Sequence, residues 1–145
     1  MTVREASRAD LPQLAELMDA YRVFYGADSD VEKARVFMHE RLIKQDSVIF
    51  VIQNDHALLG FTQLYPSFSS VSLRPLYILN DLFVTPGKRG TGLGEALLRH
   101  AQGFCREKGA KGLALETATD NPAQKLYERL GWKKDAGVFH YFWTS

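Results

Sequence analysis

Residues 84–98 read Val-Thr-Pro-Gly-Lys-Arg-Gly-Thr-Gly-Leu-Gly-Glu-Ala-Leu-Leu, a strand end that passes through a basic glycine loop into a helix. The helix is predicted because Leu93, Leu97, Ala101 and Cys105 recur at helical spacing. Glycines lack a Cβ, so backbone N–H groups in the loop can converge on an anion, and the helix adds its unpaired first-turn donors. The segment indicates a phosphate-binding loop, with a tight turn before an ordinary helix as the alternative.

Two nucleotide-binding patterns fit this loop poorly. A P-loop needs Ser or Thr after Gly87-Lys88, where Arg89 stands. The dinucleotide pattern G-x-G-x-x-G is met at Gly90 and Gly92, but Glu95 occupies the place of its third glycine. A nucleotide-binding domain is therefore disfavoured.

Composition and charge predict one globular domain over residues 1–145. The chain is 46% hydrophobic, and its 18 Lys and Arg against 17 Asp and Glu give no charge-based case for a nucleic acid partner. No run approaches the roughly 20 apolar residues of a membrane span, so we expect no membrane association and a cytoplasmic protein. The four histidines lack metal-ligand spacing, and Cys105 lies on an apolar helix stripe, so neither a metal nor a cysteine nucleophile is expected.

Hydrophobic periodicity and turn residues predict a mixed α/β (α+β) fold. The expected elements are strand 2–6, helices 11–25 and 31–42, strands 48–52 and 58–65, a loop at 66–70, strand 76–84, the helix after the glycine loop, strand 113–117, helix 123–130, and strands 132–134 and 138–143.

A second segment, residues 115–132, carries Ala123, Tyr127 and Gly131-Trp132. With the R-x-x-G-x-G pattern of the glycine loop and the element order of the whole chain, it resembles the GNAT superfamily of acyl-CoA N-acyltransferases. Seven residues before Tyr127, where the family has an asparagine, stands Asp120, so either Asp120 or the adjacent Asn121 takes that position.

The resemblance implies the GNAT fold, a mostly antiparallel mixed sheet of about seven strands flanked by about four helices. It also implies acetyl-CoA as cofactor. The residues expected to bind it are Leu82, Phe83, Val84, Arg89, Gly90, Thr91, Gly92, Leu93, Gly94, Asn121, Ala123 and Tyr127. The motif along residues 79–84 is closest to the spermidine/spermine and histone/polyamine acetyltransferase group, but Asn80 precedes Asp81 where polyamine enzymes can carry two acids.

Acetyl transfer from a thioester to an amine needs a base, an oxyanion donor and an acid. Tyr127 fits the acid, because a phenol of pKa about 10 can protonate a thiolate whose thiol has a pKa of about 8.5. The Leu82 N–H is expected to polarise the thioester carbonyl. Asp81 and Glu116 are the catalytic base candidates, acting directly or through water.

The acceptor is expected to be a primary amine on a small molecule or a protein. The first two helices and the loop after the third strand are expected to form the acceptor side, together with polar residues of the strand that leads into the glycine loop. The residues expected to bind the acceptor are Tyr21, Tyr25, Asp28, Tyr65, Asn80 and Asp81. An apolar terminal strand, residues 140–143, favours a homodimer. The alternative function is a CoA-binding regulatory or interaction domain without efficient catalysis.

Overall fold

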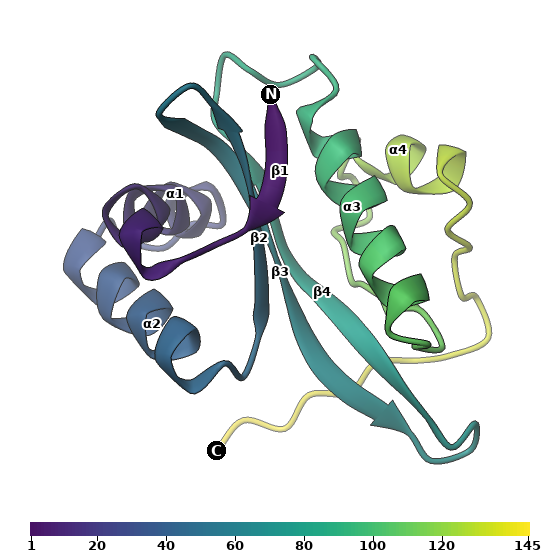
Figure 1. Cartoon of the computed structure of the whole chain (residues 1–145). Coiled ribbons are helices and arrows are strands. Elements are labelled where there is room, and N and C mark those ends of the chain that lie inside the picture. Colours follow the sequence, from purple (N-terminus) through teal and green to yellow (C-terminus); the bar gives the residue numbers. More distant parts are fainter. The chain divides into compact units, whose positions relative to one another are not determined.

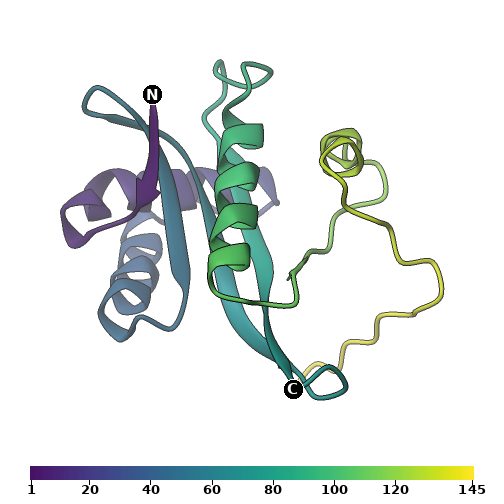
Figure 2. The same cartoon turned by 45° about the vertical axis from the view of Figure 1, so that its right-hand side comes forward.

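The computed structural model describes residues 1–145 as two compact units, residues 1–115 and residues 116–145. The first unit contains, in order, β1 (Thr2–Glu5), a 3-10 turn (Arg8–Asp10), α1 (Leu11–Phe24), α2 (Val31–Lys44), β2 (Val48–Asn54), β3 (Ala57–Ser69), β4 (Arg74–Val84), α3 (Leu93–Glu107) and β5 (Leu113–Ala114). The second unit contains α4 (Gln124–Arg129). Figures 1 and 2 show these elements from two directions.

The first unit is a five-stranded sheet in the order β1-β2-β3-β4-β5. Neighbouring strands run antiparallel except β4 and β5, which are parallel. Helices α1 and α2 lie on one face of the sheet and α3 on the other (Figure 1). The mixed α/β class and the four α-helices expected from the sequence are confirmed.

The core on the α1/α2 face forms where the apolar stripes of the two helices meet the sheet. Leu14 of α1, Met38 of α2 and Phe61 of β3 are fully buried there, and Met18 and Phe83 are nearly so. The stripes arise from the i, i+3, i+4 recurrence of apolar residues that also predicted the helices. Both helices are thereby fixed against the strands.

The second face is closed by α3. Its residues Leu97, Leu98 and Ala101 are fully buried, and the ring of Phe104 lies 5.4 Å from that of Phe50 and 5.2 Å from that of Tyr77, in edge-on geometry. The start of α3 is therefore held in a fixed position above the sheet.

Several predicted strand boundaries are wrong. The predicted loop at 66–70 belongs to β3, because residues 66–69 pair with residues 74–77 of β4. The strand predicted at 113–117 is reduced to Leu113–Ala114. Residues 132–134 and 138–143 form no strand, so the count is five and not about seven.

The aromatic run near the C-terminus explains the overcount. The side chains of Phe139, Tyr141, Phe142 and Trp143 are 82 to 90% exposed. The preference of such residues for strands reflects packing on a half-buried pleated surface, which requires a paired neighbour. Because 140–143 is not a strand here, the homodimer stays a prediction without that support.

Gly60 is a point of close backbone approach between β3 and β4. A Cβ built on Gly60 would lie 2.6 Å from the Phe83 carbonyl oxygen and 3.3 Å from the Val84 Cα. Both are backbone atoms, which cannot move aside as a side chain can. The absence of a side chain at this position lets β4 lie close against β3.

Gly60→Ala is therefore expected to lower the free energy of unfolding by about 1–3 kcal/mol, as overpacking does. Gly103→Ala is the matched control, because Gly103 lies in α3 and a Cβ there meets nothing within 4 Å. It should be neutral or stabilising by about 0.5–1 kcal/mol. Chemical denaturation of both variants measures the difference, and equal midpoints would contradict the close approach.

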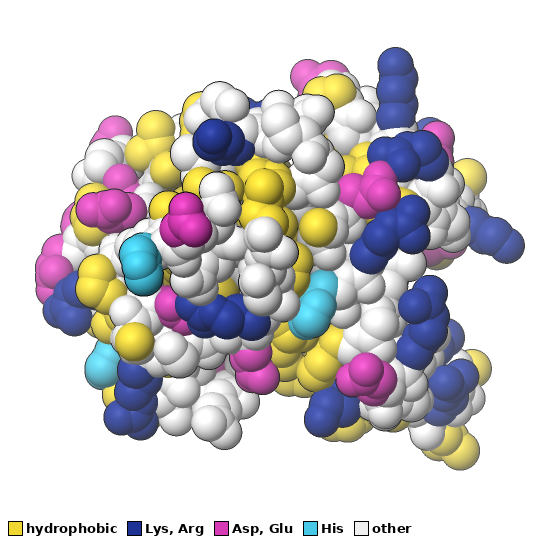
Figure 3. Space-filling view, turned by 45° about the horizontal axis from the view of Figure 1, so that its top comes forward, with side chains coloured by type: hydrophobic (Ala, Val, Ile, Leu, Met, Phe, Trp, Pro, Cys, Tyr) yellow, Lys and Arg dark blue, Asp and Glu magenta, His cyan; other side chains and the backbone are white.

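Basic and acidic side chains both appear on the face drawn in Figure 3. The chain's 18 Lys and Arg nearly balance its 17 Asp and Glu. None of the helices is both long and apolar enough to span a membrane.

Candidate functional site

The glycine loop begins with a tight turn at the end of β4. Lys88 N–H donates to the Thr85 carbonyl at 3.1 Å, and Gly87 between them has φ +87°, the geometry of a turn with Pro at its second and Gly at its third position. The Thr91 hydroxyl donates back to the Lys88 carbonyl. The chain is thereby reversed from β4 into α3.

Gly90 and Gly92 continue the loop in the left-handed region, with φ +76° and +87°. Gly92 is the N-cap of α3, and no side chain caps this helix end. The N–H groups of Gly90, Gly92 and Leu93 have no hydrogen-bonded acceptor. Unpaired donors at the positive end of a 15-residue helix suit an anionic ligand such as a phosphate.

The Arg89 side chain packs against the end of β4, where the glycine loop begins. Its Nε donates to the Val84 carbonyl at 3.1 Å, and its guanidinium stacks 5.1 Å from the Phe24 ring centre and 5.3 Å from that of Phe83. These contacts fix the path from β4 into the loop. The two Nη atoms of Arg89 take no part in the bond to Val84 and are available to bind an anionic ligand.

The outer edge of β4 is open along half of its length. β4 pairs with β5 only at Tyr77 and Ile78, so residues 79–84 have no strand partner on that side. This edge includes Leu82, Phe83 and Val84. An unpaired strand edge offers alternating N–H and C=O groups to an extended ligand that carries amides.

A β-bulge at Asn80 changes which way the side chains of β4 point. Leu64 pairs with Leu79 and Gln63 with Asp81, so Asn80 has no residue opposite it. Before the bulge Tyr77 packs on α3, whereas after it Phe83 belongs to the α1/α2 core. The extra residue shifts the alternation of side chains between the two faces of the sheet by one residue. The Asp81 carboxylate is therefore directed toward α1 and α2.

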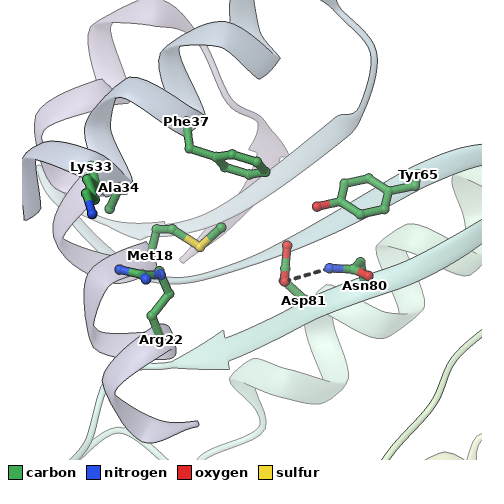
Figure 4. Close-up of a pocket in the computed structure, with 8 residues that line it drawn as sticks. All are labelled: Met18, Arg22, Lys33, Ala34, Phe37, Tyr65, Asn80 and Asp81. Carbon is green, nitrogen blue, oxygen red and sulfur yellow. Dashed lines mark hydrogen bonds between the residues drawn. The ribbon is translucent and has the colours of Figure 1, made fainter. Parts of the chain in front are cut away.

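The Asp81 carboxylate lines a pocket of about 380 Å³ on this face. Figure 4 shows the pocket between α1, α2 and the strands. Its lining consists of Met18 and Arg22 from α1, Lys33, Ala34 and Phe37 from α2, Tyr65 from β3, and Asn80 and Asp81 from β4. The volume suits a small molecule or a single side chain.

Burial raises the pKa of the Asp81 carboxyl, and the polar side chains of Gln63, Tyr21 and Asn80 around it offset part of that rise. Gln63 Nε2 donates to one carboxylate oxygen, and Asn80 Nδ2 donates to the other at 3.1 Å. The side chain is only 2% exposed. A desolvated carboxylate with a raised pKa in a pocket is a stronger base than an exposed one.

Two tyrosines lie close to Asp81. Burial, and after it the Asp81 charge, raise the pKa of Tyr65 to about 12. The pKa of Tyr21 is raised well above its ordinary value, first by burial and then by the Asp81 charge. The Tyr21 hydroxyl donates to the Asn80 carbonyl at 3.1 Å. Both rings therefore stay neutral and can donate hydrogen bonds.

Three of the six predicted acceptor residues line the pocket: Tyr65, Asn80 and Asp81. Tyr21 lies beside them, since its hydroxyl donates to the Asn80 carbonyl, but it does not line the pocket. Tyr25 is 60% exposed, and its ring stacks 5.0 Å from that of Tyr21. Asp28 is exposed between α1 and α2. Neither Tyr25 nor Asp28 lines the pocket.

The remaining residues predicted for the site, Glu116, Asn121, Ala123 and Tyr127, belong to the second unit. The Tyr127 ring, on α4, lies 5.8 Å from that of Trp132, and the Asn121 side-chain oxygen accepts from Ala123 N–H at 2.9 Å just before the helix. A Glu116 carboxylate oxygen lies 3.0 Å from His140 Nδ1, and the Glu116 side chain is 77% exposed. Burial therefore favours Asp81 over Glu116 as a base.

Cys105 lies on the buried stripe of α3 and is 5% exposed. Burial raises the pKa of its thiol to about 11, so almost none of it is thiolate at neutral pH. A covalent route through this cysteine is disfavoured.

Five pocket residues were missed in the sequence: Met18, Arg22, Lys33, Ala34 and Phe37. Met18 and Arg22 are four residues apart on α1, as are Lys33 and Phe37 on α2, so each pair shares a helix face. That spacing was visible in the sequence. What was not visible is that the two helices place these faces opposite the bulge.

Comparison with known proteins agrees with this geometry. The family model for the acetyltransferase (GNAT) family matches residues 14–132. The chain is 44% identical over 142 residues to the uncharacterised N-acetyltransferase YhfO of Bacillus subtilis strain 168, covering 97% of this chain and 95% of that protein.

Two solved structures have the same fold. A crystal structure named as a probable acetyltransferase superposes with a TM-score of 0.93 at 40% identity, covering 100% of this chain and 98% of the other. AAC(6')-Iy, solved in complex with the bisubstrate analogue CoA-S-monomethyl-acetylneamine, superposes with a TM-score of 0.79 at 21% identity, covering 99% and 98%. The chain therefore belongs to the GNAT family and is an acetyl-CoA-dependent acetyltransferase.

Proposed function

We propose that the protein transfers the acetyl group of acetyl-CoA to a primary amine by direct attack within a ternary complex. The observation that carries this mechanism is the buried Asp81 carboxylate in a pocket on β4, the strand whose outer edge is open and whose end leads into the glycine loop. β4 would therefore bind the cofactor along its open edge, and its residues Asn80 and Asp81 would line the acceptor pocket.

The cofactor would lie along β4. Its pyrophosphate would bind the N–H groups of residues 89–94, where donors at the start of α3 are unpaired. Its pantetheine amides would pair with the backbone of Leu82, Phe83 and Val84, as an added strand does. Asn121, Ala123 and Tyr127 are retained as cofactor contacts on the sequence pattern alone.

The chemistry needs three proton transfers: two from the nitrogen and one to the thiolate. Asp81 takes the proton from the ammonium, directly or through a water, and the free amine attacks the thioester carbon. The Leu82 N–H stabilises the developing oxyanion. The new C–N bond forms as the C–S bond breaks, and the attacking nitrogen loses its second proton to water. Tyr127 donates its proton to the departing thiolate and regains one from solvent.

Release of CoA thiol from acetyl-CoA, followed across a panel of amines, tests this function. We expect turnover with at least one primary amine, recovery of the N-acetylated product, and intersecting initial-velocity lines, as a ternary complex requires. Polyamines belong in the panel because of the motif along residues 79–84. Binding of acetyl-CoA without consumption across the panel would instead support a CoA-binding regulatory domain.

Substitution at Gly92 tests the cofactor loop. Gly87 and Gly92 share a φ of +87°, and a Cβ on either meets nothing within 4 Å. Alanine should therefore cost each a similar free energy of unfolding, about 1–3 kcal/mol. Alanine keeps the N–H but disfavours a φ of +87°, so the backbone donors at the start of α3 should turn away from the phosphate. Only Gly92→Ala should therefore also weaken CoA binding, by roughly tenfold, the size of one lost charge-assisted hydrogen bond.

Calorimetric titration with CoA measures the affinity and thermal unfolding measures the stability. Equal affinity losses in Gly87→Ala and Gly92→Ala would contradict a phosphate site at the helix start.

A further inference from the structure

The pocket beside Asp81 carries opposite charges at its two ends. Arg22 and Lys33 line one end, and Asp81 with Asn80 and Tyr65 lines the other. In Figure 4 the apolar side chains of Met18 and Phe37 lie between the two groups. A ligand that fills this pocket therefore meets cations at one end, an apolar middle and a carboxylate at the other end.

Arg22 has unused hydrogen-bonding capacity. Its Nη1 is buried and has no hydrogen-bond partner. The charge of Arg22 acts on Asp19, but the two oxygens of Asp19 accept from the Ser29 hydroxyl and the Asp30 N–H. A buried donor left without a partner is costly, and a planar anion can satisfy a guanidinium with two parallel hydrogen bonds.

The second cation is also available. Lys33 is exposed on α2 and forms no ion pair with a carboxylate, whereas its neighbour Arg35 is engaged with Glu32 at 2.6 Å. Asp81 pairs with neither Arg22 nor Lys33, since its oxygens accept from Gln63 and Asn80. The cationic and anionic ends are therefore not neutralised by each other.

We infer that the acceptor is an amine that also carries a carboxylate, with its amine at Asp81 and Tyr65 and its carboxylate at Arg22 and Lys33. This inference rests on the proposed function and narrows its acceptor class. A polyamine fits less well, because its far ammonium group would meet Arg22 and Lys33. Like charges in a partly desolvated pocket repel.

Matched acceptors test this assignment in the wild-type protein. A series of amino acids with increasing distance between amine and carboxylate is compared with the alkylamines and diamines of the same length. Thiol release from acetyl-CoA gives kcat/KM for each. We expect the best amino acid to exceed its alkylamine and its diamine by at least roughly tenfold, the order of one charge-assisted contact.

Two substitutions locate the carboxylate. Arg22→Gln and Lys33→Gln should each reduce the amino acid to alkylamine ratio of kcat/KM by roughly threefold or more, mainly through KM for the amino acid. Lys33 is exposed, so its variant is expected to fold even if Arg22→Gln does not. Arg35→Gln on the same helix, outside the pocket, is the control and should leave the ratio unchanged.

The outcomes separate this inference from the proposed function. Absence of thiol release with every amine would overturn the proposed function. Acetylation of amines with equal or better use of diamines, or a ratio unchanged in both Arg22→Gln and Lys33→Gln, would overturn only the carboxylate assignment.

Discussion

Asp81→Asn is expected to lower kcat/KM by roughly 100-fold or more while acetyl-CoA binding is retained. General base catalysis by a positioned side chain contributes roughly 100- to 10,000-fold, and the asparagine amide cannot accept the proton of an ammonium group. The shape of the side chain is kept, so the pocket should remain. Steady-state thiol release and an acetyl-CoA titration measure the two quantities separately.

The pH dependence of this variant gives a second readout. Burial raises the pKa of Asp81 above its ordinary value of 3.8, so wild-type kcat/KM should rise with pH as this carboxyl ionises. The native state holds the proton more tightly than the unfolded state, so the contribution of Asp81 to stability falls as pH rises from that ordinary value through the raised pKa. Both features should vanish in Asp81→Asn.

Two further carboxylates control for this result. Asp55→Asn removes an exposed carboxylate in the turn between β2 and β3, where the φ of +53° suits asparagine equally well. It should behave as wild type. Glu116→Gln tests the other candidate for the general base. If this variant lost turnover while Asp81→Asn stayed active, Glu116 and not Asp81 would be the base.

Tyr127→Phe is expected to lower kcat by roughly 100-fold or more, with little change in acetyl-CoA affinity. The phenylalanine ring preserves the packing against Trp132 at the 5.8 Å ring distance but has no proton for the thiolate. An interaction made only in the transition state lowers kcat and leaves ground-state binding intact.

Tyr141→Phe provides the matched control for Tyr127, because Tyr141 lies in the same unit and is 88% exposed. It should retain wild-type kcat. Full turnover by Tyr127→Phe would mean that water or another group protonates the thiolate.

Elements with strong local periodicity could be predicted from the sequence. The stripe of α3 and the glycines before it predicted both the helix and its N-terminus, since 3.6-residue periodicity and positive-φ glycines are local properties. Strand lengths could not be predicted in the same way. Pro66 and its neighbouring serines look like a loop, but pairing with β4 keeps them extended.

The candidate site also has one part that local sequence could predict and one part that depends on the pairing of distant segments. The glycine loop is a contiguous motif, so its residues are recognisable in the chain. The pocket beside Asp81 depends on the bulge at Asn80, which sets the direction of Asp81 because Asp81 pairs with Gln63 and Leu79 with Leu64. The only local sign of the bulge was the polar pair Asn80-Asp81 in an otherwise apolar strand. The position of Arg22 in the pocket lining could not be predicted, because it depends on how α1 packs over β4.

A crystal structure with bound acetyl-CoA would locate the cofactor relative to β4 and Asp81. We expect pantetheine amides paired with the backbone of residues 82–84, phosphates at the N–H groups of residues 89–94, and the thioester next to the Asp81 pocket. A cofactor bound along another edge of the sheet, or a thioester on the α3 face away from Asp81, would contradict this placement.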